Sequence, residues 1–256
     1  MIINFLIIIQ EIMKKTAIIT GSNRGIGKEL VKIFAEAGFD IWACARSENE
    51  QFKNEIECFE LSYGVKITPV YFDLRQPEEI KKGIRQILAE KRNIDVLINN
   101  AGVPYGGLFT MTSIDKLKEV YEVNVFAQVQ IMQLVARQMM KQKSGCIINM
   151  CSVGGIETNP GYLAYGSSKA ALIRITKSVS RELGQYNIRV NGIAPGLIDT
   201  DMGNYKSEEE LNKVLDRMSI RRMGQPDEIA KAALYIASDD AEYMTGHIMI
   251  LDGGRV

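Results

Sequence analysis

Histidine is nearly absent from this 256-residue chain, in which His247 is the only one. A single imidazole supplies too few ligands for a histidine-based metal site, so we expect no metal ion. Cysteine is also scarce. The four cysteines form no C-x-x-C pair, and three lie in or beside apolar, strand-like runs, which is typical of reduced core thiols in a cytoplasmic protein. They are Cys44, Cys58, Cys146 and Cys151.

An excess of either charge is missing as well, because Lys plus Arg and Asp plus Glu both number 31. No basic surplus is present to neutralise phosphates, so we expect no nucleic-acid partner. The apolar stretch from Ile2 to Ile9 is far shorter than the ~20 residues that cross a bilayer. It also lacks the basic region and cleavage site of a signal peptide. We therefore expect no membrane partner and treat residues 1–12 as an apolar extension outside the fold.

Short β-branched runs alternate with longer segments of helical apolar spacing along the rest of the chain. Runs such as Asp95–Ile98 lack polar alternation, as strands covered on both faces do. The pattern predicts a single α/β domain over residues 13–256, a Rossmann-type fold whose doubly wound, seven-stranded parallel sheet has helices on both faces. The expected strands are Thr16–Thr20, Ile41–Ala45, Lys66–Phe72, Ile94–Asn99, Cys146–Cys151, Ile188–Ile193 and His247–Leu251. The expected helices are Ile26–Ala37, Ser47–Tyr63, Pro77–Lys91, Ser113–Lys141, Leu163–Gln185 and Pro226–Ala237.

One connection is much longer than the others. No strand is expected between Pro195 and Gln225, and this stretch holds Met202, Tyr205 and an amphipathic piece from Ser207 to Met218. Long connections inside compact domains are usually functional, so we expect a substrate lid around residues 196–224. The alternative is a surface insertion without a role.

A glycine-rich turn, TGSNRGIGKE at residues 20–29, follows the first expected strand. It is not a P-loop, because Glu29 stands where that motif needs the hydroxyl of Ser or Thr. Gly21 can make the tight turn, Gly25 lets the backbone approach a pyrophosphate, and Gly27 allows close helix packing. The first N–H groups of the next helix would face the anion. The turn therefore predicts a dinucleotide site, the alternative being a turn without a ligand.

At this loop the chain resembles the short-chain dehydrogenase/reductase family, whose motif is T-G-x-x-x-G-x-G. The resemblance covers residues 15–254 and continues at later strand ends, with YFDL around Asp73, NNAG at residues 99–102 and PGLIDT at residues 195–200. It implies that these segments contact the adenine, the adenosine side and the nicotinamide, respectively. The residues expected at the cofactor are Gly21, Ser22, Asn23, Arg24, Gly25, Ile26, Gly27, Arg46, Asp73, Leu74, Asn100, Ala101, Gly102, Tyr165, Lys169, Pro195, Gly196, Ile198 and Thr200.

The same resemblance implies four catalytic residues, namely Asn124, Ser152, Tyr165 and Lys169. Tyr165 and Lys169 are four positions apart, so on a helix they share one face. A free tyrosine has a pKa near 10, and we expect the neighbouring ammonium to lower it. The implied reaction interconverts a carbonyl and an alcohol: Ser152 hydrogen-bonds the substrate oxygen and Tyr165 transfers the proton. Lys169 would also hold the nicotinamide ribose, and Asn124 would anchor a proton-relay water.

The choice of cofactor depends on the end of the second expected strand. An acidic side chain there would bind the ribose 2′-hydroxyl of NAD, but the strand ends in Cys44-Ala45-Arg46. Arg46 and Arg24 are suited to clamp a 2′-phosphate through charge-assisted hydrogen bonds. We therefore favour NADP(H) over NAD(H), the alternative being that both arginines are ordinary surface charges.

Other chemistries fit the chain less well. GSSKA, at residues 166–170, looks like a nucleophile elbow but lies within an expected helix, and a hydrolase triad would have to use His247. Cys151 has no histidine nearby in the sequence to activate it. A non-catalytic nucleotide-binding regulator is an alternative of another class, against which Ser152, Tyr165 and Lys169 argue.

Overall the chain looks most like 3-oxoacyl-acyl-carrier-protein reductases, including GQPDEIA from Gly224 and TGHIMILDGG from Thr245. The resemblance implies a 3-oxoacyl thioester on a carrier protein or CoA as substrate. The alternative is a sugar or nucleotide-linked sugar of surface or flagellin glycans. Lys141 and Lys143 are candidates for engaging an acidic carrier, whereas Tyr186 and Asn187 stand where a basic residue is often found.

The family also commonly assembles through its two long helices. We therefore expect a homotetramer, or a homodimer, that pairs the helices around Ser113–Lys141 and Leu163–Gln185. The apolar residues that fit this interface, and fit an ordinary core equally well, are Val129, Met132, Val135, Leu172 and Ile175.

Overall fold

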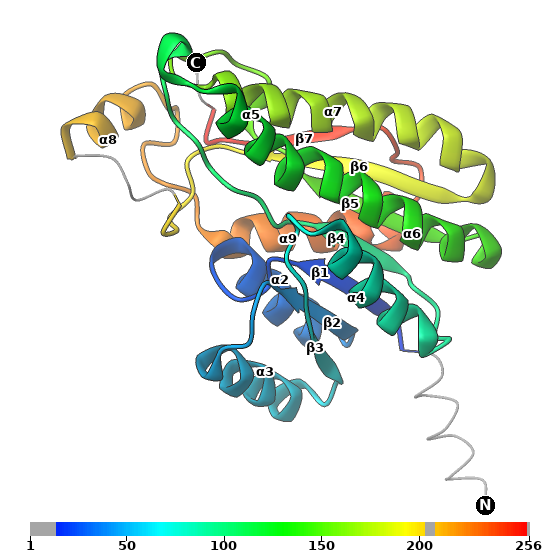
Figure 1. Cartoon of the computed structure of the whole chain (residues 1–256). Coiled ribbons are helices and arrows are strands. Elements are labelled where there is room, and N and C mark those ends of the chain that lie inside the picture. Colours follow the sequence, from blue (N-terminus) through cyan, green and yellow to red (C-terminus); the bar gives the residue numbers. More distant parts are fainter. Residues whose placement is uncertain (1–13, 203–207, 255–256) are drawn as a thin grey trace, which may run out of the picture.

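The computed structural model describes residues 14–202 and 208–254 (Figure 1). The expected extension over residues 1–12 lies outside the described residues, as do Tyr205 and Ser207 of the expected lid. No helix in the described part of the chain is long and apolar enough to cross a membrane.

A seven-stranded parallel sheet forms the centre of the molecule. Its strands are β1 (Thr16–Thr20), β2 (Asp40–Ala45), β3 (Ile67–Tyr71), β4 (Val96–Asn99), β5 (Gly145–Met150), β6 (Ile188–Pro195) and β7 (Ile248–Leu251). The strand order is β3-β2-β1-β4-β5-β6-β7. The order reverses between β1 and β4, because β1 pairs in parallel with β2 on one side and with β4 on the other. The predicted doubly wound parallel sheet is confirmed.

Helices cover both faces of this sheet (Figure 1). They are α2 (Gly25–Glu36), α3 (Glu50–Tyr63), α4 (Pro77–Ala89), α5 (Ile114–Tyr121), α6 (Ala127–Gln142), α7 (Leu163–Leu183), α8 (Glu208–Leu215) and α9 (Pro226–Ala237). Buried side chains of α2, α3 and α9 form the core on one face, and those of α4 and α6 form the core on the other.

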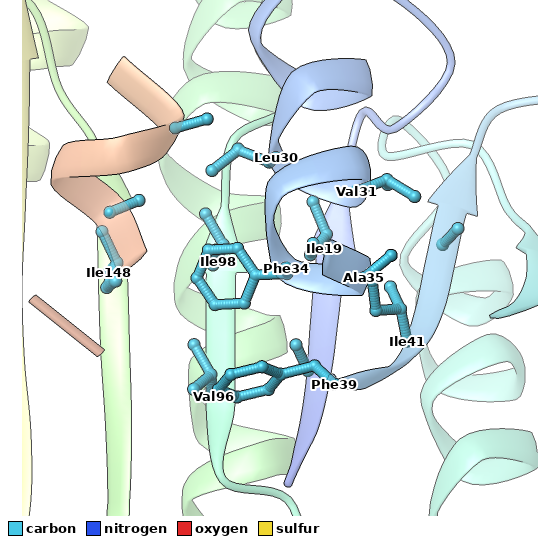
Figure 2. Close-up of a cluster of buried hydrophobic side chains, with 14 of the residues drawn as sticks. Ile19, Leu30, Val31, Phe34, Ala35, Phe39, Ile41, Val96, Ile98 and Ile148 are labelled. Carbon is cyan, nitrogen blue, oxygen red and sulfur yellow. The ribbon is translucent and has the colours of Figure 1, made fainter. Parts of the chain in front are cut away.

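Alternate residues of the central strands supply these two cores. In β1, Ile19 faces α2 and α9, whereas Ile18 faces the opposite layer. Figure 2 shows Leu30 and Phe34 of α2 packed over Ile19 and Ile98. Because both faces are buried, neither needs polar residues, which explains the uninterrupted apolar runs of the sequence.

Many expected boundaries differ from the structure by one to three residues, and one expected helix is divided. The helix expected from Ser47 begins at Glu50, because the Asn49 side chain caps it by accepting a hydrogen bond from the Phe52 N–H at 3.2 Å. The strand expected from Ile94 begins at Val96. The long helix expected over Ser113–Lys141 is divided, since a π-helical segment, η2 (Glu122–Phe126), separates α5 from α6.

The residues expected to pair subunits are mostly core residues of the single chain. Met132, Val135 and Leu172 are almost completely buried, and Val129 and Ile175 pack against the α4–α6 core. The first three cannot reach a second chain without unfolding their own helix. The exposed apolar side chains nearby belong instead to the stretch around α5 and include Phe109, Met111, Ile114 and Phe126.

Candidate functional site

The glycine-rich turn joins β1 to α2 in a conformation that excludes larger side chains. Gly21 and Gly25 have positive φ angles of +69° and +52°, and a Cβ on Gly27 would lie 1.8 Å from the Gly21 carbonyl oxygen. The Asn100 side chain donates to the Thr20 carbonyl at 2.9 Å and so fixes the turn against β4. No side chain caps α2, which leaves its N-terminus suited to an anion.

A cavity of about 990 Å³ connects this turn to the carboxyl ends of the other central strands. Its wall is formed by residues after β1, β4, β5 and β6 and by the first turns of α7. This is the edge where the strand order reverses, the place at which ligands bind in open α/β sheets. The expected site residues that line it are Gly21, Asn23, Arg24, Gly25, Ile26, Gly27, Asn100, Ala101, Gly102, Ser152, Tyr165, Lys169, Pro195, Gly196, Ile198 and Thr200.

Five expected site residues do not belong to this wall: Ser22, Arg46, Asp73, Leu74 and Asn124. Ser22 is buried and its hydroxyl donates to the Ile19 carbonyl at 2.7 Å, so it stabilises the turn. The Leu74 side chain lies in the core on the α4 face. Direct roles for these residues at the cofactor stay predictions.

Asp73 follows β3 and is tightly paired with Arg75, which the sequence analysis missed. The Arg75 Nη2 atom lies 2.5 Å from Asp73 Oδ2. These hydrogen bonds lower the pKa of the Asp73 carboxyl, and the positive charge of Arg46 adds to the effect. The guanidinium groups of Arg46 and Arg75 therefore both lie near Asp73, beyond the ends of β2 and β3. The sequence predicted only Arg46 at this place.

Arg24 also has a partner that the sequence analysis missed. Its Nη1 atom lies 3.4 Å from Asp201 Oδ2, and both side chains are at least 70% exposed. Exposed ion pairs contribute little free energy, so this contact leaves the Arg24 guanidinium able to exchange Asp201 for another anion.

Ser152 and Tyr165 meet at the centre of the cavity wall. Ser152 stands at the end of β5, where its hydroxyl accepts a hydrogen bond from the Gly154 N–H at 3.1 Å. The Tyr165 phenol is hydrogen-bonded to the Ser152 side chain. Burial raises the pKa of Tyr165, and the bond to Ser152 offsets part of that increase.

Lys169 lies one helical turn beyond Tyr165, with its Nζ atom 5.9 Å from the centroid of the Tyr165 ring. Its ammonium donates to the Met150 carbonyl at 2.7 Å. Burial lowers the pKa of Lys169 to about 8. The shared helix face is as expected, but the expected lowering of the Tyr165 pKa is not found, because burial raises that pKa by more than the hydrogen bond to Ser152 lowers it.

Asn124 lies in the π-helical segment and, although it does not line the cavity, it contacts residues next to the cavity wall. Its Oδ1 atom accepts from the Val103 N–H at 2.8 Å. Its Nδ2 atom donates to the Val103 carbonyl at 3.0 Å and to Ser168 Oγ at 3.1 Å. The side chain thus ties the loop after β4 to α7, and a role in proton transfer stays a prediction.

Several cavity residues were not found from the sequence. Tyr162 packs edge-on against Tyr165, with ring centroids 6.1 Å apart, and its position one turn earlier on the chain was the available signal. Tyr105, Lys116 and Arg217 also line the cavity. They come from loops and helices whose approach to the site depends on tertiary packing.

Other sequence-based candidates lie at the wrong end of the sheet. Lys141 and Lys143 precede β5, and Asn187 directly precedes β6. They therefore lie near the amino ends of these strands, opposite the cavity, and cannot form its rim. His247, which precedes β7, is likewise remote from Ser152, so no hydrolase triad is assembled. No cluster suited to a metal ion occurs among the residues that the structure describes.

Comparison with known proteins agrees with this geometry. The family model described as "Enoyl-(Acyl carrier protein) reductase" matches residues 21–255. The chain is 37% identical over 245 residues to the 3-oxoacyl-[acyl-carrier-protein] reductase FabG of Chlamydia trachomatis, covering 95% of this chain and 98% of that protein. It is 36% identical over 244 residues to the FabG reductase of Aquifex aeolicus, with coverage of 95% and 98%.

Solved structures of related proteins share the whole fold. A 7α-hydroxysteroid dehydrogenase complexed with NADH and 7-oxo glycochenodeoxycholic acid superposes with a TM-score of 0.88 at 34% identity, covering 94% of each chain. Acetoin dehydrogenase YohF from Salmonella typhimurium gives a TM-score of 0.85 at 33% identity, covering 94% of this chain and 97% of that one.

Proposed function

Because the chain belongs to the short-chain dehydrogenase/reductase family and is an NAD(P)-dependent oxidoreductase, we propose that it reduces the 3-oxo group of an acyl thioester with NADPH. The observation that carries the proposal is the single cavity joining the glycine-rich turn to Ser152, Tyr165 and Lys169. The names of the curated relatives support a 3-oxoacyl group on an acyl carrier protein as the substrate.

The residues of the cavity fit a dinucleotide. Gly21 and Gly27 keep the turn compact, because an added Cβ would lie 2.9 Å from the Ala101 Cα atom or 1.8 Å from the Gly21 carbonyl oxygen, respectively. Both glycines line the cavity, where a backbone without side chains allows close approach to a pyrophosphate. Tyr165 and Lys169 would hold the ribose next to the nicotinamide, and the segment from Pro195 to Thr200 would receive the nicotinamide itself. When bound, the cofactor supplies a hydride to the carbonyl carbon of the substrate.

A preference for NADPH is supported by the charges beyond β2 and β3. The residue after β2 is Arg46, which is exposed, and Arg75 lies next to Asp73. No acid at the end of β2 opposes a 2′-phosphate. Guanidinium groups bind phosphates through paired, charge-assisted hydrogen bonds, so Arg46 is the residue that we assign to the 2′-phosphate.

Proton transfer falls to Tyr165. The Ser152 hydroxyl would donate a hydrogen bond to the substrate oxygen, and the Tyr165 phenol would give that oxygen its proton as the carbon receives the hydride. One hydride and one proton convert the ketone to an alcohol, leaving a 3-hydroxyacyl thioester. The raised pKa of Tyr165 keeps the phenol protonated until the oxygen becomes basic.

Lys169 and Asn124 hold this arrangement in place. The Lys169 ammonium is anchored on the Met150 carbonyl and lies close to Gly102, where a Cβ would be 3.4 Å from its Nζ atom. Asn124 fixes Val103, the residue after Gly102. The two side chains therefore position the strand ends that would border the ribose.

A spectrophotometric assay of NADPH consumption at 340 nm tests the function. The purified enzyme should reduce an acetoacetyl thioester, and a panel with NADH and nucleotide-linked sugars measures selectivity. Tyr165→Phe should lower kcat by about 10²- to 10⁴-fold while NADPH binding, followed by nucleotide fluorescence, changes little. NADPH binding without turnover of any carbonyl would contradict the proposal and favour a nucleotide-binding regulator.

The proposal extends to location and assembly. Four free thiols, Cys44, Cys58, Cys146 and Cys151, support a reducing compartment such as the cytoplasm. The exposed apolar side chains Phe109, Met111, Ile114 and Phe126 support a homotetramer or homodimer formed through the stretch around α5. Light scattering of the purified protein measures the assembly directly.

A further inference from the structure

Positive charge gathers in the cavity beyond what the proposed reaction uses. The described residues of its wall include four cations, Arg24, Lys116, Lys169 and Arg217, but a single acid, Asp201. Asp201 forms an ion pair with Arg24. Lys169 is buried, and its ammonium donates a hydrogen bond to the Met150 carbonyl. Lys116 and Arg217 are therefore the two cations of the described wall that neither pair with its acid nor are buried.

Lys116 is held at the wall by an aromatic ring. It belongs to the first turn of α5, and its Nζ atom lies 5.7 Å from the centroid of the Tyr105 ring, which lines the same cavity. Its ammonium also lies 2.6 Å from Glu119 Oε2, but the two side chains are 41% and 47% exposed. Such a half-exposed pair is weak, so the ammonium can exchange Glu119 for an anion in the cavity.

Arg217 approaches from a different part of the chain. It follows α8, where its N–H donates to the Val214 carbonyl at 3.1 Å, and Val214 also lines the cavity. Its side chain is exposed, and it forms no ion pair among the described residues. Figure 1 shows α8 standing apart from the helical layers, beyond the edge of the sheet that carries the cavity.

We propose that Lys116 and Arg217 bind a phosphate ester on the substrate and thereby select phosphorylated acyl thioesters. This inference rests on the proposed function, because it assigns the part of the thioester that lies away from the reacting carbonyl. Two cations from separate elements suit an anionic phosphate group, and both are donors of charge-assisted hydrogen bonds. The phosphate ester belongs to free 4′-phosphopantetheine thioesters, to CoA thioesters or to a carrier-linked arm.

A matched pair of substrates isolates the phosphate. Acetoacetyl-pantetheine and acetoacetyl-4′-phosphopantetheine present the same reacting ketone and differ only in the phosphate ester. With NADPH saturating, wild-type enzyme should show the lower KM for the phosphorylated compound, and rising salt should reduce the difference. Acetoacetyl-CoA and acetoacetyl-carrier protein, run in parallel, distinguish the sources of the phosphate.

Charge-removing variants assign the preference to residues. Lys116→Met and Arg217→Gln should each reduce the preference for the phosphorylated compound about tenfold, the size expected for one hydrogen bond to a charged group. Lys118→Met, two residues along α5, and Arg221→Gln, four residues beyond Arg217, are matched controls outside the cavity wall. They should keep the wild-type preference, and Lys116→Arg should restore most of it.

The outcomes separate the two proposals. Reduction of both thioesters by the wild-type enzyme without preference, or an equal loss of preference in the control variants, would overturn the phosphate site and leave the proposed function standing. Failure to reduce either thioester would overturn the proposed function and the phosphate site with it. Thermal unfolding of each variant verifies that the substitutions leave the fold intact.

Discussion

The ammonium of Lys169 donates a hydrogen bond of 2.7 Å to the carbonyl oxygen of Met150, the last residue of β5. This contact joins the helix that carries Tyr165 to the strand that presents Ser152. Because the lysine is almost completely buried, its charge is maintained at a cost in solvation free energy.

That cost makes stability depend on pH. The pKa of Lys169 is about 8 in the folded chain, whereas an ordinary lysine, as in the unfolded chain, has a pKa of 10.5. Between these two pH values the unfolded chain binds a proton that the folded chain has lost. The free energy of unfolding from this group therefore rises with pH, by roughly 2 kcal/mol between pH 8 and 9.5. Urea unfolding of the wild type minus that of Lys169→Met should show the increase, and a difference that is flat across this window would contradict it.

Gly27→Ala should disable the glycine-rich turn. The added Cβ would lie 1.8 Å from the Gly21 carbonyl oxygen, which forces the backbone apart and costs about 1–3 kcal/mol of stability. NADPH affinity, measured by fluorescence titration, should fall at least tenfold. Gly184→Ala is the control, because no atom lies within 4 Å of its added Cβ and its backbone is helical; that variant should gain stability and bind NADPH normally.

Arg46→Asp should exchange the cofactor preference. It places an acid at the end of β2, where a carboxylate accepts from a ribose 2′-hydroxyl and repels a 2′-phosphate. We expect KM for NADPH to rise at least tenfold while KM for NADH changes little or falls. Arg137→Asp, an exposed position on α6, controls for the change of net charge. Equal losses for both cofactors would refute the assignment.

Tyr162→Ala should slow turnover through Tyr165. The edge-on contact between the two rings, with centroids 6.1 Å apart, contributes about 0.5–1.5 kcal/mol in such pairs, so its loss should loosen the phenol and lower kcat about three- to tenfold. Tyr162→Phe keeps the ring and should retain most of the activity. A fall in kcat of the same size in both variants would instead assign the effect to the hydroxyl group.

Much of the fold was predictable because local pattern and global topology agree. The strand Thr16–Thr20 and the helix Pro226–Ala237 were predicted at both ends, since glycine or proline marks their boundaries. The residues at the strand ends were equally accessible, because a parallel sheet brings the residues that follow its strands to one edge. The π-helical turn at Asn124 carries no such signal, and neither apolar spacing nor composition distinguishes it from a continuous helix.

The remaining parts of the site depend on distances that a linear sequence does not contain. Asp201 meets Arg24 from 177 positions away, and Lys116 meets Tyr105 across a loop. The error over Lys141 and Lys143 has the same origin. Their place before β5 puts them at the opposite edge of the sheet from the cavity, a separation that a motif resemblance does not reveal.

The reversal of strand order between β1 and β4 has a consequence for biosynthesis. Because the cavity takes its walls from residues near both 21 and 200, no ribosome-bound fragment ending before β6 contains a complete site. Contacts between such distant segments form late in folding. Catalytic competence therefore arises in one step, when the second half of the sheet has joined the first, and enzyme activity reports on the integrity of the entire molecule.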